Sequence, residues 1–350
     1  MTGIGYIEAC AAPLDRVRRA TFRWASTVPA LRAILYRRDR RLAVQASIGI
    51  AIGFALVVSA PVAVMAISPA LLGVPHLASD IRYLVIRQNL PRWWLRAALG
   101  GCLALFALRL VDELALGGGA TGRIEMILAG TWIAGAGVAG AAVSGAWRRL
   151  RVALPIVGAL AVLGAVFPDT SRLVFAHLHN VVALVLWAFL FRKRLWVAVA
   201  PFALIAIAIP LFLSGATTPL TAQLGGDTAF GLSLAQVSSW LAPGCGPDLA
   251  IGIALSYIFL QGIHYAVWLG WIPQEELPGQ STMSFKSSLR SVVRDLGTVG
   301  FWIVLGLMVV VLGASFVNLH GTRNLYLSLA VFHGYLELAM LCFLVMARRR

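Results

Sequence analysis

The longest stretch of this chain without a charged side chain runs from Leu42 to Ser79. About 20 apolar residues in a helix are enough to cross a bilayer, so this stretch is longer than one complete span. In a soluble domain roughly a quarter of the residues are charged, and charge interrupts the sequence far more often. The stretch therefore restricts the chain to folds that place apolar helices in a membrane, and it excludes a soluble globular domain.

The composition of the whole chain agrees with this restriction, because 60% of its 350 residues are hydrophobic and only 12% are charged. Apolar runs bounded by charged residues, glycine or proline predict ten helices in an all-α polytopic membrane protein. We expect one transmembrane bundle over residues 42–347, with a basic arm at 1–41 before it and a short tail at 348–350 after it. The expected spans are residues 42–67, 69–88, 95–116, 124–146, 152–167, 173–191, 195–213, 249–271, 297–318 and 323–346.

The formal net charge of +15 would suggest a nucleic-acid partner in a soluble protein. Here the basic residues gather in alternate connections between the expected helices, and positively charged connections stay on the cytoplasmic side of a membrane. The other side has only Arg123, Arg172 and Arg323. We therefore expect a bacterial-type inner membrane, both termini in the cytoplasm and no nucleic-acid partner. The basic clusters lie in the arm before residue 42, at 87–96, at 148–151, at 192–194, at 286–294 and at 348–350.

Residues 14–41 mix arginine with apolar side chains such as Leu14, Val17, Phe22 and Trp24. Basic amphipathic helices of this composition lie on anionic membrane surfaces. We therefore expect an interfacial helix on the inner leaflet, with a soluble partner-binding arm as the alternative.

The expected outer connection at residues 214–247 is long and rich in glycine and proline. Long connections of this kind fold over functional sites in some proteins and are merely long in others. A lid or re-entrant segment is therefore one hypothesis for it, and a plain loop is the other.

Five of the six histidines fall within expected spans. An ionisable side chain in the membrane is costly unless it is paired or liganded, so each of the five is a functional candidate. These histidines are His76, His177, His179, His264 and His333. At about 1.5 Å of rise per residue, His76 lies about 10 Å and His333 about 15 Å from the outer end of its helix. His264, at about 22 Å, fits a common outer-to-middle layer of the membrane least well.

Imidazole is the commonest metal ligand, so these histidines on four helices predict a metal site. The alternative for any one of them is a hydrogen bond between helices. His177 and His179 lie about 200° apart on a helix, and we therefore expect one ligand from this pair, with His179 favoured. The sixth histidine, His320, is expected in a loop outside the site.

Polar neighbours extend the candidate site. In two of the helices an acid follows the histidine by four residues, which places both side chains on one helix face. A carboxylate near metal-bound imidazole either completes the ligand shell or orients the ring. The additional candidates are Asp80 after His76, Glu337 after His333, Gln261 and Tyr265 beside His264, and Asn180 beside His179.

Other polar positions are expected to be structural. Arg109 has Asp112 and Glu113 three and four residues after it, which predicts an ion pair near the outer end of its helix. Glu125 is expected at a helix start, where the helix dipole favours an acid. The small residues at 135–140 predict close helix packing.

The segment Gly73-Val74-Pro75-His76-Leu77-Ala78-Ser79-Asp80 resembles the Gly-x-Pro-His-Gly-x-x-Asp signature of bacterial membrane β-carotene dioxygenases related to the bacteriorhodopsin-associated protein. The resemblance implies a helical membrane enzyme that splits an apolar isoprenoid with O₂ and histidine-bound non-haem iron. It would make His76 a ligand and Asp80 its neighbouring acid. Leu77 stands where that signature has glycine, and the His177/His179 spacing is narrower than the His-xxx-His pair expected there. A distant metal-dependent relative is therefore expected, rather than a carotene dioxygenase itself.

Together these features predict a metal-dependent integral-membrane oxidoreductase, with iron as the expected metal and an apolar lipid or isoprenoid as substrate. Membrane lipids are the other expected partners. Two alternatives remain open. One is a haem-binding electron-transfer protein with two axial histidines, and the other is a proton-coupled transporter that uses the intramembrane histidines and acids.

Overall fold

The computed structural model describes residues 3–88, 90–116, 120–276 and 284–348. Within these residues, ten helices are long and apolar enough to cross a membrane, in agreement with the ten apolar runs. The two strands of the described part are short and form one hairpin. The chain is therefore an all-α polytopic membrane protein, and residues 349 and 350 of the expected tail lie outside the described residues.

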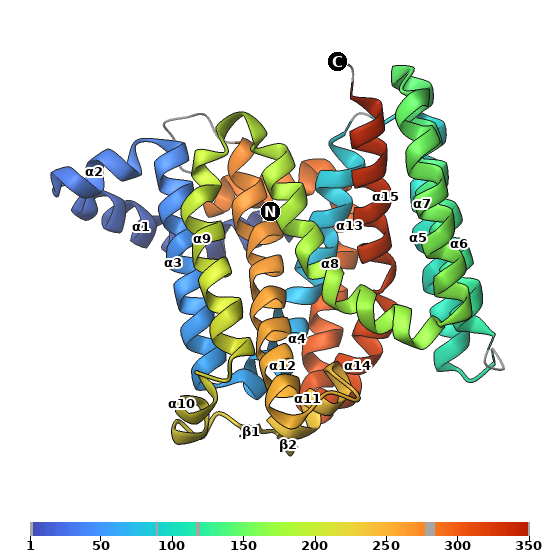
Figure 1. The fold of residues 1–350 in the computed structure, drawn as a ribbon. Helices are drawn as coiled ribbons and strands as arrows, with labels where there is room; N and C mark the ends of the chain where they lie inside the picture. The colour runs from blue at the N-terminus through green and yellow to red at the C-terminus, as the bar shows by residue number, and fades with distance from the viewer. Residues whose placement is uncertain (1–2, 89, 117–119, 277–283, 349–350) are drawn as a thin grey trace. The chain divides into compact units, whose positions relative to one another are not determined.

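The helices of the chain are drawn in Figure 1, and they form two compact units. Unit 1 contains the chain up to Val64 and Trp187–Leu307, and unit 2 contains Met65–Leu186 and the chain from Met308 onward. The chain passes between the units inside α4 (Pro61–Asp80), α8 (Pro168–Leu190) and α13 (Phe285–Val317).

Unit 1 is built on three helices that pack against one another, α3 (Arg38–Ser59), α9 (Trp196–Leu213) and α12 (Pro247–Ala266). Phe54, Phe212 and Phe259, one from each helix, form an aromatic cluster with ring centroids 5.1 to 6.3 Å apart. Gly252 allows α12 to approach α9, because a Cβ there would lie 2.6 Å from the carbonyl oxygen of Phe212. The turn η2 (Arg192–Arg194) precedes α9, and α12 continues into η3 (Val267–Trp271), a π-helix, and η4 (Ile272–Glu276), a 3₁₀-helix.

The expected outer connection at 214–247 is ordered into short elements. These are α10 (Thr218–Gln223), the hairpin β1 (Thr228–Ala229) and β2 (Leu232–Ser233), and α11 (Leu234–Leu241). Ser233 begins α11 with a capping box, in which its hydroxyl and the side chain of Gln236 each bond the other's backbone N–H. Helix α10 packs on α3 and α11 on α12, so this segment is attached to its own unit, and its role as a lid remains a prediction.

The basic arm forms two helices, α1 (Gly3–Ala25) and α2 (Pro29–Leu35), instead of one. Pro29 is the first residue of α2, a position where the absent N–H costs nothing. Asp15 holds the arm to the start of α13, where it accepts hydrogen bonds from the backbone N–H groups of Phe285 (2.9 Å) and Lys286 (3.2 Å). Burial alone would raise the pKa of Asp15, but these hydrogen bonds and the Arg18 guanidinium bring that pKa below its ordinary value of 3.8.

Unit 2 contains η1 (Ile81–Ile86), α5 (Arg92–Glu113), α6 (Thr121–Ser144), α7 (Trp147–Val166), α14 (Leu319–Leu329) and α15 (Phe332–Ala347). Both α7 and α15 pack on α6, and their shared core includes Ala141, Leu150 and Met346. A Cβ on Gly140 would lie 2.5 Å from the carbonyl oxygen of Phe343. The small residues of α6 therefore permit the close helix packing that the sequence predicts.

The expected boundary between the first two spans is wrong. The first span ends at Ser59, and the second begins at Pro61 and takes the residues up to Ile67 that were expected to end the first. Proline lacks an N–H and restricts the residue before it, and Ala60 accordingly leaves the helical region with φ −153° and ψ 55°. Because the segment is free of charge, hydropathy alone does not locate this break.

Helix α13 contains a break at Gly297, whose φ of 72° lies in the left-handed region that favours glycine. The ninth span was expected to begin at residue 297, and the break divides the helix at that point. His320 was expected in a loop, but it lies in the first turn of α14, which begins at Leu319. Asn318 starts this helix by accepting a hydrogen bond from the backbone N–H of Gly321.

Candidate metal centre

Helix α4 presents His76 and Asp80 one turn apart on the same face. Pro75 lies inside the helix directly before this pair, and the π-helix η1 begins directly after it at Ile81. Single-turn π-segments inside helices occur frequently at functional sites. Since α4 begins at Pro61, His76 lies about 22 Å along the helix from its start at about 1.5 Å per residue, deeper than the expected 10 Å.

The imidazole of His76 contacts Asp80, with 3.3 Å between Nε2 and Oδ2. Asp80 is completely buried, and in the described part of the chain neither of its carboxylate oxygens accepts a hydrogen bond. Glu337 is also completely buried. One ligand atom from each of His76, Asp80 and Glu337 lies within 4.8 Å of the other two, as in groups that can hold a metal ion.

His333 joins this group from α15, one turn before Glu337. Its Nδ1 is hydrogen bonded to the carbonyl oxygen of Ala330 at the junction of α14 and α15, which fixes the orientation of the ring. The ring lies edge-on to that of His76, with 4.9 Å between centroids. The two histidine–acid pairs of α4 and α15 therefore face one place in unit 2.

His179 is the third histidine of the cluster. Its Nε2 lies 3.2 Å from the Nε2 of His333, and the ring centroids are 5.1 Å apart. Because neutral imidazole has one donor and one acceptor nitrogen, this contact is either a hydrogen bond between the rings or the approach of two nitrogens that bind one cation. His177 lies on another side of α8, since two residues turn a helix by about 200°.

The other candidates behave differently. Asn180 is buried but donates its amide to the carbonyl of Ala176 on its own helix. His264, Gln261 and Tyr265 lie in α12 of unit 1, where all three are buried and the Gln261 amide is 3.5 Å from the Tyr265 hydroxyl. Their roles as a ligand and its supporting residues remain predictions.

We define the histidine–carboxylate cluster as His76, Asp80, His179, His333 and Glu337. Mixed imidazole and carboxylate donors suit first-row transition metals, including non-haem iron. Asp80 supplies the test of fit, because a buried carboxylate without a hydrogen bond needs a cation or a proton nearby. The residues present therefore fit a divalent metal ion.

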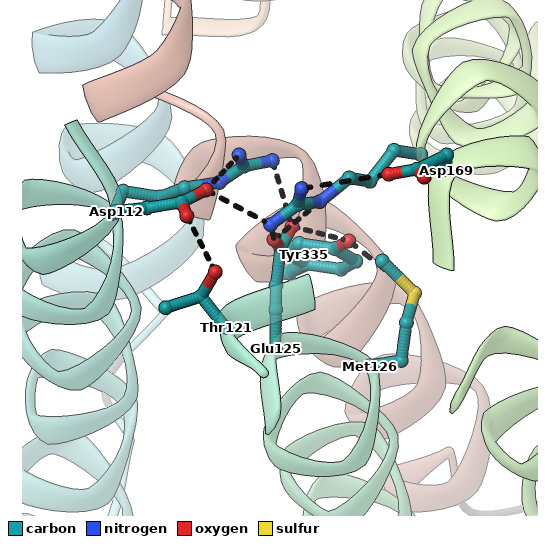
Figure 2. Close-up of polar contacts among 8 residues, drawn as sticks. Asp112, Thr121, Glu125, Met126, Asp169 and Tyr335 are labelled. Atoms are coloured by element: carbon teal, nitrogen blue, oxygen red, sulfur yellow. Dashed lines mark hydrogen bonds and ion pairs between the residues drawn. The ribbon is translucent and has the colours of Figure 1, made fainter. Parts of the chain in front are cut away.

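A second buried acid in unit 2 has quite different surroundings (Figure 2). Glu125 contacts Arg109 Nη2 at 3.1 Å and Arg172 Nη2 at 2.8 Å, and it accepts a hydrogen bond of 3.0 Å from the Tyr335 hydroxyl. Asp112 contacts both arginines, at 3.6 and 3.3 Å. We call these five residues the arginine–carboxylate network.

This network corrects two expectations. Glu125 was expected only to favour a helix start, but it is completely buried and links α5, α6, α8 and α15 through its partners. Arg109 pairs with Asp112 as expected, whereas Glu113 is exposed. Arg172 and Tyr335 were missed. The signal that could have identified Arg172 is its position among the few arginines on the expected outer side. A charged side chain at the end of a membrane span is stabilised by a partner inside the protein.

A scan against protein-family models, a search of curated proteins and a search of solved structures each found no match. The resemblance of the segment around His76 to the carotene dioxygenase signature therefore remains a prediction from eight residues. The geometry of the cluster carries the functional interpretation.

Proposed function

We propose that this chain is a metal-dependent membrane oxidoreductase whose metal ion is held by the histidine–carboxylate cluster. The observation that carries the proposal is Asp80, which is fully buried, accepts no hydrogen bond within the described residues, and lies beside Glu337 and His76. Two ionised carboxylates at this separation repel each other, and burial in a membrane span adds to the cost. A divalent cation removes both penalties.

Iron is the metal we propose, because imidazole with carboxylate is the donor set of non-haem iron sites that keep positions open for other ligands. Such an ion would supply O₂-dependent oxidation when bound. Of the residues of this chain, the imidazoles of His76, His179 and His333 and the carboxylates of Asp80 and Glu337 would hold the ion. The hydrogen bond between Nδ1 and the Ala330 carbonyl fixes the orientation of the His333 ring, so that Nε2 is the nitrogen of this ring that would bind the ion.

An apolar lipid or isoprenoid is the proposed substrate class. The cluster lies in helices long and apolar enough to span a membrane, and a substrate dissolved in the bilayer reaches such a site without crossing water. We place the protein in a bacterial-type inner membrane with both termini in the cytoplasm, on the alternation of basic connections.

A proton-coupled transporter is the second candidate, and the two neighbouring carboxylates favour it, since acids inside membrane spans often carry protons. The haem alternative is less well supported. Two axial ligands of one haem bind on opposite faces of the macrocycle, whereas the Nε2 atoms of His179 and His333 are only 3.2 Å apart.

The test is the metal content of the purified full-length protein, measured per chain together with the visible spectrum. We expect one ion per chain and no haem absorption band. His76→Ala, His179→Ala and His333→Ala should lose most of the metal, and so should His264→Ala if it is the fourth ligand. His177→Ala is the matched control, two residues from His179, and should retain the metal.

Three outcomes contradict the proposal. Full occupancy in His76→Ala, His179→Ala and His333→Ala would make these histidines structural. A haem band that disappears in the same variants would favour the electron-transfer alternative. Absence of metal from the wild-type protein, with proton-coupled substrate uptake in vesicles, would favour the transporter.

A further inference from the structure

A basic cavity opens in unit 1 where α3 and α9 begin. It has a volume of about 540 Å³ and is lined by Tyr36, Arg37, Arg38, Asp39, Arg40, Arg194 and Trp196. Helices α3 and α9 pack side by side along their lengths (Figure 1). By the distribution of basic connections, this end of the two helices is the cytoplasmic end.

The cavity carries an excess of positive charge. Its single acid, Asp39, is already engaged by Arg194 at 3.0 Å and by Arg38 at 3.4 Å. Within the described residues, no acidic side chain pairs with Arg37 or Arg40. The lining therefore offers two guanidinium groups to an anion from outside the chain, and guanidinium binds phosphate oxygens through paired hydrogen bonds.

The cavity continues into an apolar surface. Four residues after Arg40, and then at each further turn of α3, the same helix face carries Val44, Ile48 and Ile52, which are 36%, 54% and 55% exposed. On α9, Val199 follows Trp196 by three residues and is 64% exposed. A ligand with its charged group in the cavity would thus have apolar surface directly below it, in the direction of the bilayer.

The aromatic residues mark the same level. Tyr36 and Trp196 are 44% and 54% exposed, and such half-exposed aromatic rings collect where lipid headgroups meet the acyl chains. A soluble anion would gain nothing from the apolar face of α3, whereas a phospholipid would use both parts of the surface.

We propose that this cavity binds the phosphodiester headgroup of an anionic phospholipid of the inner leaflet, such as phosphatidylglycerol, with its acyl chains along Val44, Ile48 and Val199. Arg37 and Arg40 bind the phosphate, and Arg38, Asp39 and Arg194 hold the wall of the cavity together. Basic pockets at the cytoplasmic ends of transmembrane helices bind lipid headgroups by the same chemistry. The site is independent of the metal centre.

The experiment uses the full-length protein in mixed micelles and measures phosphatidylglycerol binding by native mass spectrometry, with phosphatidylcholine as the neutral lipid. Each arginine near a membrane surface contributes about 1 kcal/mol to binding an anionic lipid, so Arg37→Gln/Arg40→Gln should weaken the binding roughly 10- to 30-fold. Arg40→Gln alone should weaken it roughly fivefold, which provides a readout if the double variant folds poorly.

The matched control is Arg92→Gln/Arg96→Gln, which removes the same charge from exposed positions of α5 outside the basic arm. It should leave the phosphatidylglycerol affinity within about twofold. Equal losses in the two double variants would show diffuse surface attraction and overturn the proposal. Unchanged phosphatidylglycerol affinity in Arg37→Gln/Arg40→Gln would overturn it as well. Binding of inorganic phosphate to the wild type as tight as that of phosphatidylglycerol would also overturn it.

Discussion

Unit 2 contains two buried carboxylate sites that differ in how their charge is neutralised. Glu125 is surrounded by the guanidinium groups of Arg109 and Arg172 and by the Tyr335 hydroxyl, all within 3.1 Å. Asp80, equally buried, lies 3.3 Å from the imidazole of His76, and within the described residues its carboxylate accepts no hydrogen bond. The charge of Glu125 is thus neutralised by side chains of the protein, whereas on our proposal a metal ion neutralises Asp80.

One helix takes part in both sites. Tyr335 of α15 lies between His333 and Glu337 in the sequence, and its ring stacks on Phe175 of α8 with 4.2 Å between centroids. The arginine–carboxylate network therefore fixes the position of α15 that presents His333 to His179. On our proposal, the arginine–carboxylate network stabilises unit 2 and the histidine–carboxylate cluster carries the chemistry.

The largest expected effect is on stability, in Glu125→Gln. Removing one partner of a buried ion pair costs about 3–5 kcal/mol, and we expect about 3 kcal/mol here because the arginine side chains are 12% and 23% exposed. The measurement is the free energy of unfolding in detergent micelles. Glu113→Gln, at an exposed acid of α5, is the control. Similar losses of unfolding free energy in Glu125→Gln and Glu113→Gln would show that the buried contacts of Glu125 add no stability.

Asp80→Asn and Glu337→Gln should reduce metal binding strongly and stability only slightly. We expect metal retention to weaken about 10- to 100-fold, as it does when groups that support a metal site are lost. The metal-free variants should unfold within about 1 kcal/mol of the metal-free wild type, because an amide keeps the shape of each buried acid and is cheaper to bury than a charge. Metal bound per chain and unfolding free energy are measured on the same samples.

The transporter alternative gives a different result in these two variants. Glu337→Gln would then mimic the protonated acid, retain any metal and abolish turnover. Full metal occupancy in both variants would mean that neither carboxylate belongs to a metal site.

Gly73→Ala tests the position of the α4 segment that carries His76. A Cβ on Gly73 would lie 2.5 Å from ring carbons of Tyr326 in α14, and overpacking of this kind costs about 1–3 kcal/mol. Tyr326→Ala in the Gly73→Ala background should recover part of the loss, which a double-mutant cycle of unfolding free energies measures. Additive losses would show that the two residues are not in contact.

Asp15 gives the smallest effect, outside the membrane spans, and extends the comparison to a carboxylate held by backbone N–H groups. Its pKa lies below the ordinary 3.8, so its contribution is present above that value and is lost as the pH falls through the lowered pKa. The protection of α1 amides from hydrogen exchange, relative to their intrinsic rates, should therefore fall below pH 3.8 in the wild type. In Asp15→Asn this protection should be low at all pH values, and identical protection profiles in the two proteins would exclude this role.

Local features of the site were accessible from the sequence. Asp80 and Glu337 could be assigned to the faces of His76 and His333 because a helix repeats nearly every four residues. The same geometry separated His177 from His179. The break at Ala60 could not be located from hydropathy, because the residues on both sides of it are uncharged. The proline at 61 did not identify the break either, because two further prolines lie inside the helix that follows.

The sequence by itself determined the ten helices of the described residues that are apolar and long enough to cross a membrane, because hydropathy and helix length are properties of contiguous residues. Only the tertiary structure decided which side chains meet. His179 and His333 are 154 positions apart, and Arg172 and Glu125 are 47 apart. Such contacts depend on how the helices pack and rotate against one another, and the periodicity of residues within one helix does not specify this. Among the buried acids, the partners distinguish Glu125, which contacts two arginines, from Asp80, which contacts a histidine.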